Sequence, residues 1–201
     1  MTMWFARFRK ALLLLLPLVS YRCLASVEVV QAFADAIEEG NSQGVKQILQ
    51  KIPTLIDRLG PEAKTPLMHT IHSQNWKGFK ALMENGADVT IPEETGYSPL
   101  DVATMMGSPR MVKMLLKAGA DPLRKVQGWY PLHRACSGLS DDHTEIVEIL
   151  LEHGVPHDLE GKAGKKCIDL CGRNYATYHE VMHRTMAELR EGNKEEAENE
   201  F

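Results

Sequence analysis

The side chains best placed for chemistry lie in the run His179-Glu180-Val181-Met182-His183, near the carboxyl end of the chain. This run matches the H-E-x-x-H pattern, in which two histidines four residues apart share one face of a helix and can bind Zn²⁺. The glutamate between them can act as a general base toward a zinc-bound water. The pattern therefore allows a zinc-dependent hydrolase in which His179 and His183 bind the metal and Glu180 activates water.

A catalytic zinc site needs a third protein ligand, and the residues that follow the pattern supply it poorly. The segment between His183 and Phe201 is short, and its acids Glu188 and Glu191 belong to the same helix or to its end. The chain has no G-x-S-x-G, no glycine-rich phosphate loop and no C-x-x-C. We therefore expect no enzymatic activity, no cofactor and no bound metal, and the zinc hydrolase stays as the less favoured alternative.

The first 25 residues have the layout of a secretory signal peptide. Basic residues within the first ten precede an apolar run over residues 11–19, and the small side chains of Cys23 and Ala25 suit the subsites of signal peptidase. This layout predicts cleavage after Ala25, entry into the secretory pathway or secretion, and no membrane attachment of the mature chain. The run is shorter than the about 20 apolar residues that cross a bilayer. An uncleaved signal anchor at residues 11–19, tethering the protein to a membrane, stays as an alternative.

The chain has four cysteines in 201 residues, which are too few for a disulfide-stabilised scaffold. Cleavage after Ala25 would leave Cys136, Cys167 and Cys171, so at least one thiol stays free or pairs with another chain. Cys167 and Cys171 lie four residues apart, on one face of a predicted helix. A disulfide between them would be strained, and buried packing is the other interpretation. The sequence therefore leaves the disulfide state of these three cysteines open.

The composition and charge exclude several classes of function. Hydrophobic residues make up 44% and charged residues 25% of the chain, which is enough apolar surface for a folded core. The net charge of −4 becomes −8 after removal of residues 1–25, with 19 basic against 27 acidic residues left. Such a balance argues against a nucleic-acid partner. We expect residues 175–201 to form a capping helix and a solvated acidic tail.

Two markers recur with a period of about 33 residues and keep the same register. The first is a triplet that starts a helix, and it stands at Thr65-Pro66-Leu67, Ser98-Pro99-Leu100 and Tyr130-Pro131-Leu132. The second is a glycine that follows each triplet at a nearly constant distance, at Gly86, Gly119 and Gly154. Two independent markers in one register indicate an internal repeat.

The local patterns predict two helices in each repeat. A hydroxyl residue at the N-cap followed by proline begins the first helix, as at Thr65-Pro66 and Ser98-Pro99. Ser98 and Asp101 also have the spacing of a capping box, with a shorter acid than the usual glutamate. Apolar residues at i, i+3 and i+4 give the second helix one buried face, as in Val112-x-x-Leu115-Leu116. The recurring glycines follow this helix, where left-handed backbone ends it.

The period and the segment Gly128-Trp-Tyr-Pro131-Leu132-His133-Arg134-Ala135 resemble the ankyrin repeat family, whose signature is T-P-L-H-x-A. The resemblance covers residues 27–174 and implies an all-α solenoid of about five helix-turn-helix repeats with hairpin fingers. The first repeat covers residues 28–60, the second, third and fourth begin near Thr65, Ser98 and Tyr130, and the fifth begins at Lys166. Degenerate first and last repeats would act as caps. The resemblance also implies a monomeric, non-enzymatic module that binds a protein partner of unknown identity through its concave face.

One departure from the family bears on stability. The signature threonine and histidine of the family bond to each other. Here the two positions are occupied by Thr65 and Met68 in one repeat and by Ser98 and Asp101 in the next. We therefore expect this local bond to be missing, and packing between repeats to supply more of the stability.

The family's contact positions, transferred repeat by repeat, predict the partner-binding residues. Tyr97 and Trp129 occupy the same position in adjacent repeats and are candidate hot spots. Met105 and Met106 beside them would form an adaptable apolar patch. The alternative for Trp129 is local packing over its own hairpin. The full predicted set is Lys64, His72, Glu94, Thr95, Tyr97, Met105, Met106, Val126, Gln127 and Trp129.

Overall fold

The computed structural model describes residues 21–60, 64–171, 179–181, 183–185 and 187. Within these residues every regular element is a helix, and extended pairing is limited to a bridge between Val126 and Trp129. The predicted all-α class is therefore confirmed for the described part of the chain. The helices are α2 (Tyr21–Glu39), α3 (Ser42–Lys51), α4 (Pro66–His72), α5 (Trp76–Glu84), α6 (Pro99–Met105), α7 (Pro109–Lys117), α8 (Pro131–Ser137) and α9 (Asp141–Glu152), with short 3-10 helices η2 (Pro53–Leu55), η4 (Lys162–Gly164) and η5 (Cys167–Leu170).

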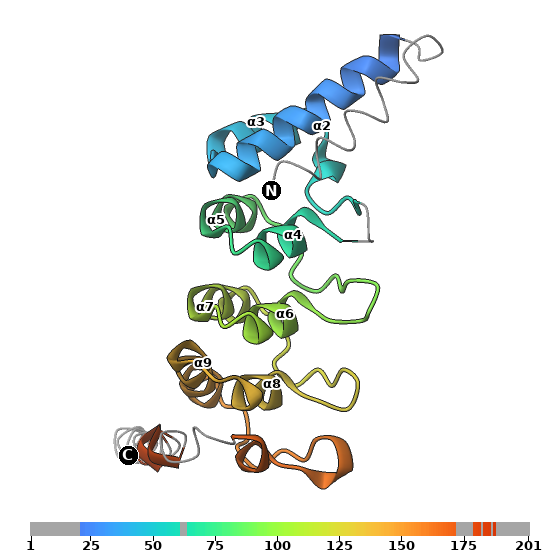
Figure 1. Ribbon diagram of the computed structural model, residues 1–201. Coiled ribbons are helices and arrows are strands. Elements are labelled where there is room, and N and C mark those ends of the chain that lie inside the picture. The colour runs from blue at the N-terminus through green and yellow to red at the C-terminus, as the bar shows by residue number, and fades with distance from the viewer. Residues whose placement is uncertain (1–20, 61–63, 172–178, 182, 186, 188–201) are drawn as a thin grey trace, which may run out of the picture. The chain divides into compact units, whose positions relative to one another are not determined.

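The chain divides into two compact bodies, and each is described by itself. The first contains the residues up to Arg58 together with Trp76–Ala87, and therefore α2, α3 and α5 (Figure 1). The second contains Leu59–Asn75 and the chain from Asp88 onward, and therefore α4 and α6 to α9.

In the first body, α2 packs against α3 and α5. Its 19 residues far exceed the seven of α4, α6 and α8, so the first repeat begins with an unusually long helix. This helix begins at Tyr21 and therefore includes the predicted cleavage point after Ala25. Phe33 and Ile37 of α2, Val45 of α3 and Phe79 of α5 are buried. Among the described residues, no helix combines the length and apolar content needed to cross a lipid bilayer.

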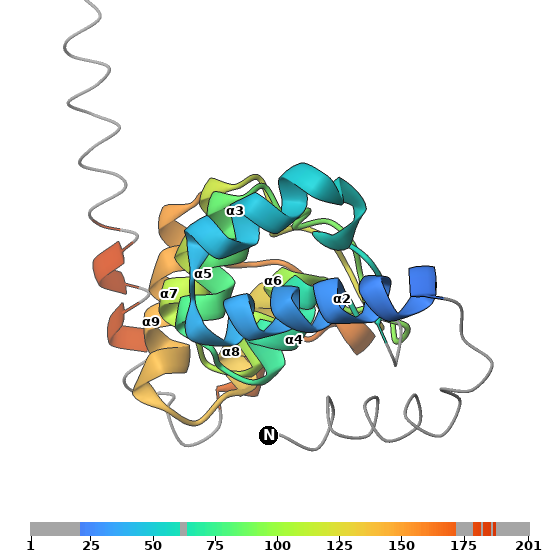
Figure 2. The ribbon, with the colours of Figure 1, turned by 90° about the horizontal axis from the view of Figure 1, so that it is seen from above.

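In the second body, first helices stack on first helices and second helices on second helices. α6 packs against α4 and α8, while α7 packs against α9, and both α6 and α8 also pack on the second helix of their own repeat (Figures 1 and 2). A fully buried leucine from each of α6, α7, α8 and α9 fills this stack: Leu100, Leu115, Leu132 and Leu150. Burying one such side chain stabilises the fold by about 1.5–3 kcal/mol.

In the third repeat, the capping box that the Ser98–Asp101 spacing predicts takes the place of the threonine–histidine bond. Ser98 Oγ donates to Asp101 Oδ2 at 2.7 Å, the Ser98 N–H donates to the same oxygen at 3.0 Å, and the Asp101 N–H donates to Ser98 Oγ at 3.2 Å. This is a complete capping box with aspartate in place of glutamate. Asp101 therefore replaces the signature histidine as the partner of the N-cap. In the second repeat, Thr65 Oγ1 accepts only from the Met68 backbone, at 3.2 Å.

The hairpin finger of the fourth repeat is closed by a two-residue turn. Val126 and Trp129 exchange backbone hydrogen bonds of 2.9 and 3.0 Å. The two residues between them both have positive φ, 53° at Gln127 and 86° at Gly128. Such turns match the twist of a hairpin, but a left-handed conformation is uncommon for glutamine. A side-chain contact that holds Gln127 in this conformation is therefore expected.

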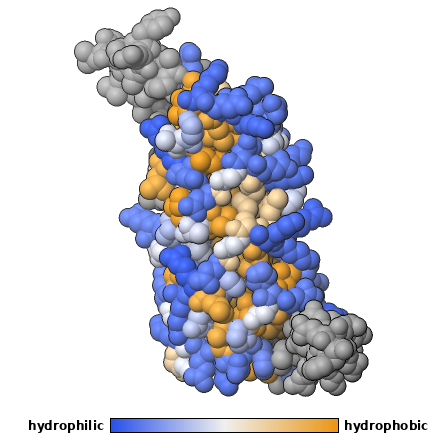
Figure 3. Space-filling view, turned by 180° about the vertical axis from the view of Figure 1, so that it is seen from behind, coloured by the Kyte–Doolittle hydropathy of each residue, from blue (hydrophilic) through white to orange (hydrophobic). Residues whose placement is uncertain are grey.

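The predicted fifth repeat is shorter than the others. Its first helix is the single 3-10 turn η5, and its packing partner is α8. The predicted capping helix lies partly outside the described residues, and the described residues between 179 and 187 are helical. Figure 3 shows a surface on which hydrophobic residues form patches between hydrophilic ones. The large apolar side chains that are exposed in the described part are Leu59, Met105, Leu123 and Leu139.

Candidate protein-binding surface

A buried arginine links the third and fourth repeats. Arg134 of α8 donates from Nε to Asp101 Oδ1 of α6 at 3.0 Å, and from Nη2 to the Val126 carbonyl at 2.9 Å. The side chain of Arg134 is 9% exposed and that of Asp101 is 0% exposed. Asp101 therefore bonds to the N-cap of its own helix with one oxygen and to the next repeat with the other.

The same arginine positions an aromatic ring. The Arg134 guanidinium lies over the Tyr97 ring, 4.5 Å from its centroid, in a cation–π contact. The Tyr97 hydroxyl donates to Gln127 Oε1 at 2.8 Å, which holds the left-handed Gln127 in place. Met105 Sδ lies 3.9 Å from Arg134 Nη1. Tyr97, Met105, Gln127 and Arg134 therefore form one continuous cluster across two repeats, called the Tyr97 cluster below.

A second polar group joins the second repeat to the finger of the third. His72 Nε2 lies 2.9 Å from Glu93 Oε2, and Thr95 Oγ1 donates to Glu93 Oε1 at 2.6 Å. Burial alone would raise the pKa of Glu93, but the bonds from Thr95 and His72, with the positive charge of Lys64, outweigh it and lower the pKa. Glu93 is therefore a carboxylate at neutral pH. Its neighbour Glu94 is exposed at the finger tip.

Trp129 has a different environment from Tyr97, although the two occupy equivalent positions. Its ring lies 5.4 Å from the His133 ring, centroid to centroid. A Cβ placed on Gly161 would lie 2.7 Å from Trp129 Cε3, so the ring packs closely on the backbone of the next finger. Both Trp129 and Tyr97 are half-buried. Trp129 therefore packs on the first helix of its own repeat and on the finger of the next, whereas Tyr97 shares Arg134 with the exposed Met105.

Two other predicted binding residues contribute less side chain to the surface than expected. Val126 is buried and pairs through its backbone with Trp129, so its prediction as a surface contact is corrected. Met106 is half-buried, and its carbonyl accepts from Gln74 Nε2 at 3.1 Å. Met105 is 46% exposed and therefore forms the apolar part of the candidate surface.

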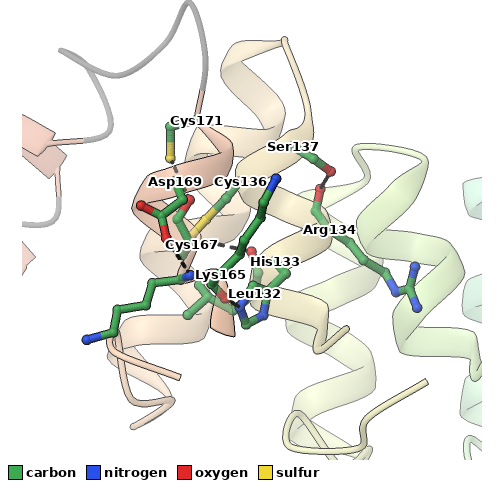
Figure 4. Close-up of a disulfide and its surroundings, with 10 residues drawn as sticks. Leu132, His133, Arg134, Cys136, Ser137, Lys165, Cys167, Asp169 and Cys171 are labelled. Carbon is green, nitrogen blue, oxygen red and sulfur yellow. Dashed lines mark hydrogen bonds between the residues drawn. A yellow bond between two sulfur atoms is a disulfide. The ribbon is translucent and has the colours of Figure 1, made fainter. Parts of the chain in front are cut away.

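The cysteines that the sequence left open lie together at the junction of α8 and η5. Cys136 and Cys167 form a disulfide with a Cα–Cα distance of 5.5 Å (Figure 4). Cys171 is a free, buried thiol whose Sγ donates to the Cys167 carbonyl at 3.2 Å. Burial, together with the negative charge of Asp169, raises the pKa of Cys171 to about 12. The odd thiol is therefore protonated and buried rather than reactive.

The H-E-x-x-H run does not assemble a metal site within the described residues. His179 and His183 face each other with their Nε2 atoms 3.2 Å apart, as expected for positions i and i+4 of a helix. Glu180 and His183 are exposed. Among the described residues, the side chains close enough to share one ion are those of three cysteines, and neither histidine belongs to that group. Arg184 of the same helix forms an ion pair with Glu148 of α9.

Sequence reasoning missed Arg134 and Glu93, and it placed Asp101 only in the capping box with Ser98, not in the ion pair with the next repeat. Arg134 occupies the variable position of the T-P-L-H-x-A signature, where no preference points to a role. A signal was nevertheless present, because Asp101 and Arg134 are separated by 33 positions, which is one period of the repeat. Opposite charges separated by one period lie on neighbouring repeats and can pair.

Stacked helix pairs with a period near 33 residues define a helical-repeat protein. Family models agree with this assignment: a model of ankyrin repeats in three copies matches residues 33–126, and a model of a single ankyrin repeat matches residues 127–162. The chain belongs to the ankyrin repeat family, whose members are protein–protein interaction modules and are generally not enzymes.

Curated relatives share this repeat region within different proteins. Protein phosphatase 1 regulatory subunit 27 of Mus musculus is 30% identical over 89 residues, 44% of this chain and 58% of the relative. The probable 26S proteasome regulatory subunit p28 of Saccharomyces cerevisiae is 27% identical over 142 residues, 69% of this chain and 61% of the relative. The E3 ubiquitin-protein ligase Ufd4 of Drosophila melanogaster is 41% identical over 137 residues, 66% of this chain and 5% of the relative. The chain spans less than two thirds of the length of each of these relatives.

Proposed function

We propose that this protein is exported and binds a protein partner through the Tyr97 cluster and the finger tips of the third and fourth repeats, without catalysing a reaction. The observation that carries this proposal is the fixed position of Tyr97. Its ring lies against the Arg134 guanidinium, and its hydroxyl is held by Gln127. A surface whose side chains are already ordered loses little conformational entropy on binding.

The cluster has the chemistry of an interface hot spot. Met105 supplies an exposed, adaptable apolar side chain, and Tyr97 and Gln127 supply polar atoms beside it. The exposed residues Glu94 and Thr95 lie on the finger of the third repeat. The expected partner surface therefore presents an apolar side chain to Met105, surrounded by polar groups. The relatives named as regulatory subunits support a binding role, since such a subunit acts by association.

Two matched substitutions test the binding face. Met105 and Leu123 are 46% and 48% exposed, so replacing either with glutamate changes the same amount of apolar surface. Affinity capture with the full chain identifies the partner, and calorimetry then measures its binding to Met105→Glu and Leu123→Glu. We expect Met105→Glu to weaken binding by at least about tenfold, which corresponds to about 1.4 kcal/mol, and Leu123→Glu to leave it unchanged. Equal affinity of both variants would remove the Tyr97 cluster from the interface.

Export is tested separately, by sequencing the amino terminus of the protein after expression in secretory cells. The proposal expects a mature chain in the medium that begins at Ser26, because the small residues Cys23 and Ala25 precede that position. An intact amino terminus in the membrane fraction would instead support the tethered alternative with residues 11–19 as anchor. An intact chain in the cytosol contradicts both.

A further inference from the structure

Three cysteine side chains from the fourth and fifth repeats meet at one point of the second body. Cys136 lies on α8, Cys167 begins η5, and Cys171 directly follows η5. All three are buried, and their sulfur atoms lie within 4.8 Å of one another. Figure 4 shows the Cys171 sulfur directed toward the Cys136–Cys167 pair. The proposed partner-binding surface uses none of these residues.

We propose that the reduced side chains of Cys136, Cys167 and Cys171 form a binding site for a soft d10 cation, of which Cu(I) and Zn²⁺ are the common examples. Thiolates are the ligands that these cations prefer among protein side chains. Cu(I) accepts three sulfur ligands, whereas structural Zn²⁺ sites use four ligands. We therefore expect Cu(I) to bind the three-cysteine site more tightly than Zn²⁺.

The distances fit one shared ion. A zinc–sulfur bond is about 2.3 Å long, so three sulfurs around one ion in a plane lie about 4 Å apart. No two of the three sulfurs are more than 4.8 Å apart, and after reduction the bonded sulfurs of Cys136 and Cys167 must separate by about 2 Å to reach that arrangement. The Cα atoms of Cys136 and Cys167 are 5.5 Å apart, which brings both sulfurs into reach of one ion without moving α8 away from η5.

The surroundings hold the Cys171 side chain in place and supply positive charge near the thiolates. Cys171 Sγ already donates to the Cys167 carbonyl, so its side chain faces the cluster before any ion binds. Lys165 and Lys166 directly precede Cys167 and supply positive charge in the segment that would hold anionic thiolates. Metal ligands buried in a folded domain also gain from exclusion of water, which competes for the ion.

The disulfide and the ion exclude each other, because the Cys136–Cys167 bond occupies two of the three sulfurs. A two-electron reductant, such as a dithiol or a phosphine, must first convert that disulfide into two thiols. One cation then forms three metal–sulfur bonds, and each thiol releases its proton to solvent. The cysteine cluster therefore has an oxidised state with one disulfide and one thiol, and a reduced state with three potential ligands.

The experiment uses the full chain, kept reduced by a phosphine under nitrogen. Cu(I) is supplied as its bicinchoninate complex, and Zn²⁺ as the chloride in a parallel series. Metal per chain is measured by mass spectrometry after gel filtration, and thiolate-to-metal absorption is recorded in the ultraviolet. We expect about one Cu(I) per reduced chain, and at least about tenfold less metal in the oxidised chain. A reduced wild-type chain that retains neither Cu(I) nor Zn²⁺ overturns the proposal without any variant.

Matched variants assign the ligands. Cys171→Ser and Cys136→Ser should each lower the bound metal at least about tenfold. His179→Ala tests the H-E-x-x-H run, and we expect it to retain the metal. Far-UV circular dichroism checks that each variant is folded. Metal that persists in Cys171→Ser, or that is lost in His179→Ala, contradicts the three-cysteine site.

Discussion

The third and fourth repeats are joined by two ion pairs that differ in burial. Arg134 and Asp101 meet at 3.0 Å with side chains 9% and 0% exposed. Lys113 and Glu145 also meet at 3.0 Å, with side chains 57% and 47% exposed. The sequence separations are 33 and 32 residues. Distance and topology are therefore matched, and burial is the variable.

Arg134→Met removes the positive charge and keeps most of the apolar stem. Its effect on stability therefore measures the loss of the charged interaction with Asp101. Asp101 would then be a fully buried carboxylate that has lost its cation. Breaking a buried pair from one side costs about 3–5 kcal/mol, whereas an exposed pair contributes about 0.2–1 kcal/mol. At about 2–4 °C per kcal/mol for a chain of this size, Arg134→Met should lower the melting temperature by about 6–20 °C. Lys113→Met should lower it by less than about 4 °C.

Thermal and urea unfolding followed by circular dichroism measure both variants. Adding Asp101→Asn to Arg134→Met should restore part of the lost stability, because it neutralises the unpaired carboxylate while an amide can still accept from the Ser98 N–H. Equal losses in Arg134→Met and Lys113→Met would show that burial does not set the strength of these pairs. A double variant less stable than Arg134→Met would refute the argument from an unpaired charge.

Three further predictions follow from contacts near the fifth repeat. Gly161→Ala should destabilise the fold by about 1–3 kcal/mol in urea titrations, because the added methyl would lie 2.7 Å from Trp129; a cost near zero would show that the ring moves aside at no expense. Cys171 should resist iodoacetamide at pH 8 in the folded chain and react once urea unfolds it, since its pKa is raised to about 12; rapid labelling of the native protein would contradict its burial. Burial lowers the pKa of His133, so the unfolded chain binds a proton at higher pH than the folded chain does. Stability from this group is present above pH ~6.5 and is lost as the pH falls below that value; scanning calorimetry from pH 7.5 to 5 should show a steeper fall for the wild type than for His133→Asn.

The sequence predicted the parts of the fold that depend on local patterns. Ser98-Pro99 begins α6 as expected, and the apolar stripe of Val112, Leu115 and Leu116 is buried. These features depend on residues three or four positions apart, which the chain places together through the helix alone. The length of α2 was not predicted, because its stabilising contacts come from α3 and α5.

The candidate surface was predicted less completely, since it depends on contacts between repeats. Tyr97, Gln127 and Met105 were in the predicted set, but Arg134 was not. Arg134 contacts the Tyr97 ring and Met105, and it donates to the carbonyl of Val126, which precedes Gln127. Val126 was expected at the surface because the family's contact positions include the finger, whereas here it is buried and pairs with Trp129 across the finger turn. The Cys136–Cys167 disulfide could not be deduced, since 31 residues separate the pair and only the stacking of α8 on η5 brings them together.

The side chains of α8 also determine how this region would respond to mechanical force. Arg134 points from α8 toward α6, and Cys136, two positions later, points the other way toward η5 (Figure 4). The end unit of a repeat array has one neighbour and usually frays first. Here a pull on the segment after η5 passes through a covalent sulfur–sulfur bond into α8, and then through a buried guanidinium into α6. Tension is thus distributed over the third and fourth repeats and does not detach the fifth repeat alone. Reduction of the Cys136–Cys167 disulfide would remove this connection.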